Sequence, residues 1–199
     1  LAVVLGAATS AALAQSPAPA PKALTPTQGL ARDPRLAALL ADVSPARLRA
    51  TDSVLVAFGT RHTMSDTVSA TRGIGAARRW LYAQMQQVSR SCGGCLRVEY
   101  DAAPLVVARH PPRPTVNVVN VLGWLPGRDT SRVIVLGGHY DSCVCSTNPM
   151  DSTSDAPGAD DDGSGTAAVL ELARAFAARY PKGLDATVAF ALYAAAEQG

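Results

Sequence analysis

Two apolar runs in the second half of the sequence decide the fold: RVIVLGG at residues 132–138 and ATVAFALYAA at residues 186–195. Each is the continuous apolar pattern of a strand that is covered on both faces of a sheet. The segment between them, from Thr166 to Ala178, predicts a helix. A strand, a helix and a strand in this order form a βαβ unit, whose two strands run parallel. We therefore predict an α/β fold.

Upstream of this unit, local signals predict three helices and two strands. Asp33 and Ser44 are N-cap residues, each followed by proline at the first helical position, and Gly59 ends the second helix. From Gly73 to Ser89, apolar residues recur at three- and four-residue spacing, which is typical of an amphipathic helix. The segments LRVEYD and TVNVVNVLGWLPG alternate polar and apolar residues and predict strands.

The amino-terminal part of the chain differs in composition from the rest. Residues 1–14 are uncharged, rich in alanine and, except for two hydroxyl residues, apolar. The stretch ends in the small-x-small pattern ALA. We predict that they are the remnant of a secretory signal peptide, because the stretch is too short to cross a membrane. Residues 15–32 predict a proline-rich linker, and residues 33–199 a folded domain. The expected location is secreted or periplasmic, without stable membrane insertion after signal cleavage.

The charge of the chain excludes some classes of partner. Lys and Arg number 18 against 16 Asp and Glu, a net charge of +2 at pH 7, and the basic residues are scattered. This distribution gives no argument for binding to nucleic acid or to an anionic membrane surface. With 48% apolar residues, the chain has the composition of a globular protein.

Four cysteines stand as two close pairs, Cys92 with Cys95 and Cys143 with Cys145. An even number in an exported chain favours disulfides, but the sequence leaves all three pairings open. A thioredoxin-like redox pair at Cys92 and Cys95 is disfavoured, because this pair closes a predicted helix where such a pair should open one. A four-cysteine zinc site is disfavoured by the C-x-C half and by the export signal.

The predicted βαβ unit brings several polar side chains to one edge of the sheet. His139 follows the first strand, Glu197 follows the second, and an acidic triplet at 160–162 precedes the connecting helix. These positions meet at the rim where α/β sheets bind ligands. An imidazole and several carboxylates suit zinc or a similar divalent ion. Asp141 can accept a hydrogen bond from the second ring nitrogen of His139 and fix the ligating tautomer.

Each of these residues also has an ordinary structural explanation. An Asp at a helix N-terminus is usually a cap, a lone His after a strand is usually a turn residue, and a Glu that ends a strand is usually solvated. A calcium-stabilised structural domain is a further alternative, with Asp151 and Asp155 as additional oxygen donors, although the loop lacks the spacing of the familiar hand motif. His62 and His110 lie in loop-like segments, and we interpret both as non-catalytic.

Three sequence blocks, VIVLGGHYDS, APGADDDGSGTAAVLELARAF and TVAFALYAAAEQG, together resemble the dinuclear zinc aminopeptidases related to bacterial leucyl aminopeptidase, peptidase family twenty-eight. The segments FGTRHT, RGIGAARRWL and NVVNVLG are similar to that family as well, so the resemblance covers about Leu36 to Gly199. It implies a three-layer α/β/α sandwich with a mixed, largely parallel central sheet, of which the chain would hold the amino-terminal part.

The resemblance also implies roles for individual residues. His139 and Glu197 would each ligate one of two zinc ions, Asp161 would bridge both ions, and Asp141 would orient His139. The implied substrate is a peptide, and the implied reaction is hydrolysis of its N-terminal residue by metal-activated water.

One position departs from the pattern of the family. The family ends its last block in two adjacent glutamates, the first a general base and the second a ligand, whereas this chain has Ala196-Glu197. The two remaining ligands, an Asp and a His, are expected beyond Gly199. We therefore expect an inactive or nearly inactive fragment, since a lost base costs about 10²–10⁴ in rate. The alternative is a non-catalytic homologue that binds a metal or a peptide terminus at the same rim.

Overall fold

The computed structural model describes residues 33–107, 111 and 113–198. The predicted signal-peptide remnant (1–14), the predicted linker (15–32) and His110 lie outside the described residues. The described elements are α1 (Pro34–Ala41), α2 (Pro45–Ala57), α3 (Gly73–Ser91), β1 (Arg97–Val106), β2 (Thr115–Leu125), β3 (Asp129–His139), η1 (Ala159–Gly163), α4 (Ser164–Arg179) and β4 (Ala186–Tyr193).

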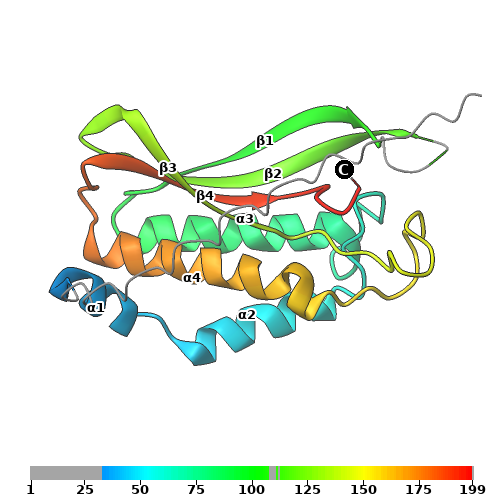
Figure 1. The fold of residues 1–199 in the computed structure, drawn as a ribbon, viewed down its shortest axis with the longest axis horizontal. Helices are drawn as coiled ribbons and strands as arrows, with labels where there is room; N and C mark the ends of the chain where they lie inside the picture. Colours follow the sequence, from blue (N-terminus) through cyan, green and yellow to red (C-terminus); the bar gives the residue numbers. More distant parts are fainter. Residues whose placement is uncertain (1–32, 108–110, 112, 199) are drawn as a thin grey trace, which may run out of the picture. The chain divides into compact units, whose positions relative to one another are not determined.

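A four-stranded mixed sheet forms one layer of the fold, with the strand order β1-β2-β4-β3 (Figure 1). β3 and β4 pair in parallel, and His139 lies opposite Tyr193 at their carboxyl ends. β4 also pairs with β2, and β2 with β1, in antiparallel fashion. The parallel pair, with α4 between its strands in the chain, confirms the predicted βαβ unit.

The helices lie on one face of this sheet (Figure 1). α3 packs against β1 and β2, α4 packs against β3 and β4, and α2 packs against α4. Leu81 and Met85 of α3, Leu170 of α4 and Phe190 of β4 are fully buried in the shared core. Each such side chain contributes about 1.5–3 kcal/mol by leaving water. The core therefore fixes the amino end of α4 close to the carboxyl end of β3.

Side-chain caps confirm the predicted starts of the first two helices. The Asp33 carboxylate accepts a hydrogen bond from the Arg35 N–H at 2.8 Å, and the Ser44 hydroxyl accepts one from the Arg47 N–H at 3.3 Å. Both caps satisfy N–H groups that the first helical turn leaves without an intrahelical partner. These starts are set by local sequence, which explains why the sequence alone locates them.

The two strands of the βαβ unit differ in burial. β4 is buried from Ala186 to Leu192, as its apolar sequence predicts. In contrast, Val133, Ile134 and Val135 of β3 are each about half exposed. The reason is that β3 lies at an edge of the described sheet, and no described helix covers the opposite face (Figure 1). Within the described residues, the expected burial is therefore confirmed for β4 and wrong for β3.

The α/β class and the mixed sheet are confirmed. Two of the three strand pairings among the described residues are antiparallel, and the described helices lie on one side of the sheet. The third layer and the parallel majority of the expected sandwich thus have no counterpart in the part of the chain that the structure describes. None of the described helices combines the length and the apolar character needed to cross a membrane.

Candidate metal centre

His139 ends β3 at the predicted rim, and its two ring nitrogens face different carboxylates. Nε2 lies 3.1 Å from Oδ1 of Asp161. Nδ1 lies 3.4 Å from Oδ1 of Asp141 and 3.3 Å from the Asp141 carbonyl oxygen. Asp141 is fully buried, whereas the Asp161 side chain is 79% exposed. Asp141 thus occupies the place expected of an orienting carboxylate, and Nε2 is the nitrogen turned toward the open side, where a metal would bind.

The surrounding carboxylates favour the protonated form of His139. The hydrogen bond to Asp141 has the largest effect, burial of the ring opposes it, and the charges of Asp141, Asp162 and Asp161 add to it. Together they raise the pKa of His139 to about 9. A metal at Nε2 would have to displace the proton from this nitrogen, so metal binding and protonation compete.

Asp161 and Asp162, which precede α4, contact different groups. Asp162 accepts hydrogen bonds from the His139 N–H at 2.9 Å and from the Gly165 N–H at 3.0 Å. It therefore joins the end of β3 to the first turn of α4 and satisfies a helix N–H. Asp161 instead turns toward the imidazole of His139. The capping explanation considered for the whole triplet thus holds for Asp162, and Asp161 is the member that reaches the candidate metal position.

Two glycines allow β3 and α4 to approach this closely. A Cβ atom on Gly165 would lie 2.2 Å from Oδ1 of Asp162, and one on Gly138 would lie 2.9 Å from the carbonyl carbon of Gly165. Real Cβ atoms are essentially never that close to other heavy atoms. Any larger residue would push the His139 end of β3 away from the acidic triplet.

Glu197 lies in the loop after β4, and buried Asp141 fixes the backbone of that loop. The Asp141 carboxylate accepts hydrogen bonds from the Ala196 N–H at 3.2 Å and from the Glu197 N–H at 3.0 Å. It also accepts one from the Thr63 hydroxyl at 3.4 Å. One carboxylate therefore positions both His139 and Glu197. The sequence spacing indicates only the first of these two contacts.

The structure brings all three predicted ligands together. One ligand atom from each of His139, Asp161 and Glu197 lies within 4.8 Å of the other two. Zinc bonds of about 2.0–2.2 Å place tetrahedral ligand atoms roughly 3.4 Å apart, so the spacing of these atoms is close to that of ligands around zinc. An imidazole with two carboxylates is also the donor chemistry that a zinc-like ion takes. The residues therefore fit the metal that the sequence pattern indicates.

The additional calcium ligands considered above do not join this cluster among the described residues. Asp151 accepts hydrogen bonds from the N–H groups of Thr153 and Ser154, which closes a turn within its own loop. Asp155 forms an ion pair with Arg72 at 2.7 Å. Both carboxylates thus have local structural roles, and the geometry favours the histidine-containing set.

The buried side chain of Arg61 holds the backbone around the candidate metal centre in place. The sequence alone indicates no role for this residue. Its guanidinium donates hydrogen bonds to the carbonyl oxygens of Tyr140 at 2.7 Å, Leu55 at 2.9 Å, Pro157 at 2.7 Å and Gly158 at 2.9 Å. It thereby ties the end of β3 to α2 and to the loop that precedes the aspartate triplet. Burial lowers the pKa of Arg61 to about 10, against the opposing effect of nearby carboxylates. The motif FGTRHT was the available signal for this residue.

His62 is also fully buried and has a structural role. Its Nδ1 accepts a hydrogen bond from the Met64 N–H at 3.1 Å, and its Nε2 lies 3.1 Å from the Pro149 carbonyl oxygen. Because Nδ1 is an acceptor, we assign the ring proton to Nε2, which donates to Pro149. Both nitrogens are occupied by backbone groups, in agreement with the non-catalytic interpretation.

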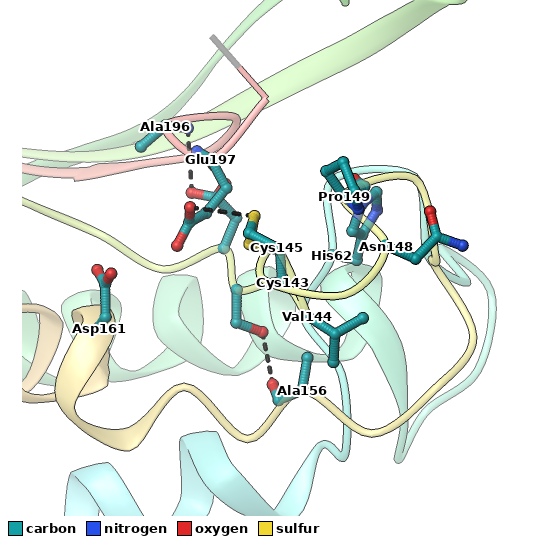
Figure 2. The surroundings of a disulfide bond; sticks show 12 residues. His62, Cys143, Val144, Cys145, Asn148, Pro149, Ala156, Asp161, Ala196 and Glu197 are labelled. Carbon is teal, nitrogen blue, oxygen red and sulfur yellow. Dashed lines mark hydrogen bonds between the residues drawn. A yellow bond between two sulfur atoms is a disulfide. The ribbon is translucent and has the colours of Figure 1, made fainter. Parts of the chain in front are cut away.

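Both cysteine pairs form local disulfides, Cys92–Cys95 and Cys143–Cys145. This pairing is one of the three that the sequence leaves open. Since no described cysteine is a free thiol, the four-cysteine zinc site is not formed. The second disulfide lies beside the candidate metal centre: Sγ of Cys145 is 3.5 Å from Oε2 of Glu197 (Figure 2).

A cavity of about 510 Å³ is lined by one of the three predicted ligands, His139. Its wall includes His139 and Asp162 at the rim, Tyr193 and Ala196 after β4, and Leu105 of β1. Apolar side chains next to a few polar groups are the usual lining of a small-ligand site. A larger cavity, of about 740 Å³, lies between α2, α3 and α4 and includes none of the predicted site residues.

Sequence comparisons connect this rim to known proteins. Residues 120–199 match the family described as Peptidase family M28. A probable zinc metalloprotease of Pyricularia oryzae is 46% identical over 168 residues, which are 84% of this chain and 32% of that protein. Leucine aminopeptidase 1 of Aspergillus fumigatus is 36% identical over 141 residues, 70% of this chain and 31% of that protein. The chain thus spans about a third of the length of these curated relatives.

Solved structures share the fold. A Zn-dependent exopeptidase from Parabacteroides distasonis has a TM-score of 0.60 and 23% identity, covering 79% of this chain and 49% of that chain. A glutaminyl cyclase from Porphyromonas gingivalis gives the same TM-score, identity and coverage. Identity at this level establishes a common fold and leaves the reaction open, because one fold supports different chemistries.

The family match falls on the part of the chain that builds the rim. It begins in β2 and includes β3, α4, β4 and the residues His139, Asp161 and Glu197. The relatives extend the similarity over most of the chain at 36–46% identity. Over residues 120–199, the chain is similar to peptidase family M28, as its motifs indicate.

Proposed function

We propose that this chain is part of a zinc-dependent exopeptidase that removes N-terminal residues from peptides. The observation that carries the proposal is the meeting of His139, Asp161 and Glu197, whose ligand atoms lie within 4.8 Å of one another at one rim of the sheet. The names of the relatives, a zinc metalloprotease and a leucine aminopeptidase, support the metal and the reaction. The resemblance of the motifs supports two zinc ions, with Asp161 between them.

The residues of the chain prepare the site for metal-assisted hydrolysis. A bound zinc supplies a water of lowered pKa and polarises the scissile carbonyl. His139 offers Nε2 because Asp141 lies against Nδ1, and Glu197 is presented because the same carboxylate holds its backbone N–H. A single buried group therefore sets the geometry of two ligands on different strands, which reduces the reorganisation needed when the metal binds.

The cavity next to the ligands suits the end of a peptide. The free, uncharged α-amine of a peptide could also bind to a zinc ion held at the rim. The adjoining wall, with Leu105, Tyr193 and Ala196, offers apolar surface for the first side chain. A peptide N-terminus would thus be held by its amine at the rim and by apolar contact in the cavity.

Ala196 is the position at which this site departs from the family motif. Its side chain is exposed and lines the cavity, at the position where the family motif has a general base. A methyl group cannot take a proton from water, so we propose that hydrolysis by this sequence is slow. Exposure also means that a longer side chain can be introduced at position 196 without disturbing the core.

The test is the substitution Ala196→Glu, with Ala196→Gln as a neutral control of matched size, both made in a protein extended past Gly199 so that it carries the two further ligands that the resemblance implies. Hydrolysis of amino-acid anilides is measured for the zinc-loaded proteins, with and without a chelator. We expect the Glu form to be faster than the Gln form by about 10²–10⁴ and the chelator to abolish the difference. Equal rates for the Glu and Gln forms would refute the assigned base position.

A second candidate function is binding without catalysis, and Ala196 is the observation that favours it. In this case the rim would hold a metal ion or a peptide terminus, and the missing carboxylate would be a true loss of the reaction. Zinc binding by all three forms, with no hydrolysis by any of them, would favour this function over the exopeptidase.

Export is part of the proposal. Its support is the apolar stretch with a small-x-small end at residues 1–14, together with two disulfides among the described residues. Disulfides persist in oxidising compartments and are rare in the cytosol. Expression of the precursor in a bacterial host, followed by fractionation and N-terminal sequencing, tests whether cleavage occurs after Ala14. Intact precursor retained in the cytosol would contradict export.

A further inference from the structure

The Cys143–Cys145 disulfide lies against a predicted metal ligand (Figure 2). Sγ of Cys145 is 3.5 Å from Oε2 of Glu197. One carboxylate oxygen of Glu197 and the two sulfur atoms all lie within 4.8 Å of one another. Glu197 therefore stands between two groups of potential ligands: His139 with Asp161 on one side, and the cysteine pair on the other.

The backbone around the cysteines is held by contacts other than the disulfide. Before Cys143, the Ser142 hydroxyl donates to the Ala156 carbonyl at 2.7 Å and accepts from the Arg61 N–H at 3.0 Å. Between the two cysteines, the Val144 carbonyl accepts hydrogen bonds from the N–H groups of Thr147 and Asn148, both at 3.0 Å. Opening the disulfide would therefore leave both sulfur atoms close to Glu197.

Cys145 is exposed, so a reductant can reach the bond. In thiol–disulfide exchange, a dithiol reductant attacks one sulfur atom and is itself oxidised to a cyclic disulfide. Two electrons and two protons pass to the protein, and Cys143 and Cys145 become thiols. Two sulfur ligands and one carboxylate then surround one point, and sulfur donors select zinc and similar soft ions.

We propose that reduction of the Cys143–Cys145 disulfide creates a second metal site, formed by the two cysteine sulfurs and Glu197. Metal binding to this site displaces the two thiol protons into solvent. Since Glu197 belongs to both ligand groups, a cation held by the cysteines withdraws Glu197 from His139 and Asp161. The effect on hydrolysis rests on the proposed function, whereas the existence of the cysteine site does not.

The test uses cadmium as a probe, because thiolate bonds to this ion absorb in the ultraviolet. The full chain carrying Cys92→Ser and Cys95→Ser, which keeps only the disulfide next to Glu197, is reduced, freed of reductant and titrated with Cd²⁺. The matched control carries Ser at all four cysteine positions, so that it has no thiol and should give no thiolate absorption. We expect thiolate absorption that saturates at one ion per chain in the first protein, and its disappearance after reoxidation.

Glu197→Gln in the first protein tests the shared ligand. We expect it to weaken cadmium binding by about tenfold, as measured by competition with a chelator of known affinity. Absence of thiolate absorption in the reduced first protein, or unchanged cadmium affinity in the Glu197→Gln form, would overturn the proposal. Circular dichroism confirms that each variant is folded.

Zinc binding by the oxidised chain separates this proposal from the proposed function. In the oxidised state, the His139 site alone is available, so His139→Gln should remove zinc binding while Cys143→Ser with Cys145→Ser should not. Zinc binding lost in the His139 variant, combined with no cadmium absorption after reduction, would leave the proposed function standing and overturn the cysteine site.

Discussion

The charged residues of the candidate metal centre fall into two groups with different surroundings, which we call the floor and the rim. The floor consists of Arg61, Asp141 and Asp162, whose charged groups form hydrogen bonds with the backbone of several elements. The rim consists of Asp161 and Glu197, which face a shared open space with His139 between strand and helix. The comparison teaches that the floor holds the fold together, whereas the rim brings together side-chain atoms that suit a metal ion.

The difference has an energetic origin. A buried charge without hydrogen bonds is costly, so the floor residues can be tolerated only because they are fully engaged. Two carboxylates that face the same space repel each other, and in the metal-free protein the protonated imidazole of His139 offsets part of that repulsion. Substitutions in the floor should therefore affect folding, and substitutions in the rim should affect metal binding.

The largest effect is expected in the floor, at Arg61. Arg61→Met removes the donors for four buried or partly buried backbone carbonyl oxygens, of which those of Leu55 and Gly158 keep a second hydrogen bond from a backbone N–H. We expect a loss of about 3–5 kcal/mol in the free energy of unfolding, measured by denaturant titration. Arg49→Met, at an exposed position of α2, is the control and should change stability by less than about 0.5 kcal/mol. Equal losses in both variants would contradict the role given to Arg61.

A smaller effect on folding and a clear effect on metal binding are expected at Asp141. The Ala196 and Glu197 N–H groups donate to different oxygens of Asp141, and Asp141→Asn replaces one of these oxygens by an NH₂ group, so one of the two N–H groups loses its acceptor. We expect a loss of about 1–3 kcal/mol in stability. Zinc affinity should fall by about 10–100-fold, since both His139 and Glu197 lose their support. An unchanged zinc affinity, measured by calorimetry, would show that Asp141 positions neither ligand.

The aspartate triplet provides the sharpest contrast between neighbours. Asp162→Asn disturbs the link between β3 and α4 and should cost about 1 kcal/mol in stability. Asp161→Asn should leave stability within about 0.5 kcal/mol while it weakens zinc binding. Thermal unfolding without metal and calorimetry with zinc measure the two properties separately. If the two variants exchanged these effects, the division of the triplet into floor and rim would be wrong.

The smallest effect is a pH dependence of stability that comes from His139. Its pKa is raised in the folded state to about 9, above the ordinary value of about 6.5. Protonated His139 therefore stabilises the metal-free protein fully below about pH 6.5, and this contribution is lost as pH rises through about 9. Thermal unfolding of the wild type and of His139→Gln is compared in the presence of a chelator. The difference between them should shrink with rising pH, and a constant difference would exclude the assigned pKa.

The parts of this molecule that follow from local sequence are the parts that could be predicted. The caps at Asp33 and Ser44 and the βαβ unit depend on neighbouring residues and on the handedness and direction of short connections. The rim follows from that unit, because parallel strands and the returning helix share one edge. This is why His139, Glu197 and the aspartate triplet at 160–162 could be grouped without coordinates, whereas the choice of Asp161 within the triplet came from the family resemblance.

The parts that depend on contacts distant in sequence could not be predicted. Arg61 reaches carbonyl oxygens up to 97 positions away in the chain, and no spacing rule identifies such partners. The hydrogen bond from the Glu197 N–H to Asp141 also joins residues that are far apart in the sequence, so no spacing rule predicts it. Exposure of β3 depends on which strand lies at the edge of the sheet, and an apolar run does not reveal that position. The local pairing of Cys143 with Cys145 was likewise one of several equal possibilities.

The most direct test of the central claim is calorimetric titration of Zn²⁺ into the oxidised, metal-free chain, with His139→Gln and Asp161→Asn as variants and Asp155→Asn as the matched control. The three-residue cluster predicts zinc binding by the wild type and by the Asp155 control, and a strong loss of affinity in the His139 and Asp161 variants. Zinc binding of equal strength in all four proteins, or in none of them, would contradict a metal centre at this rim.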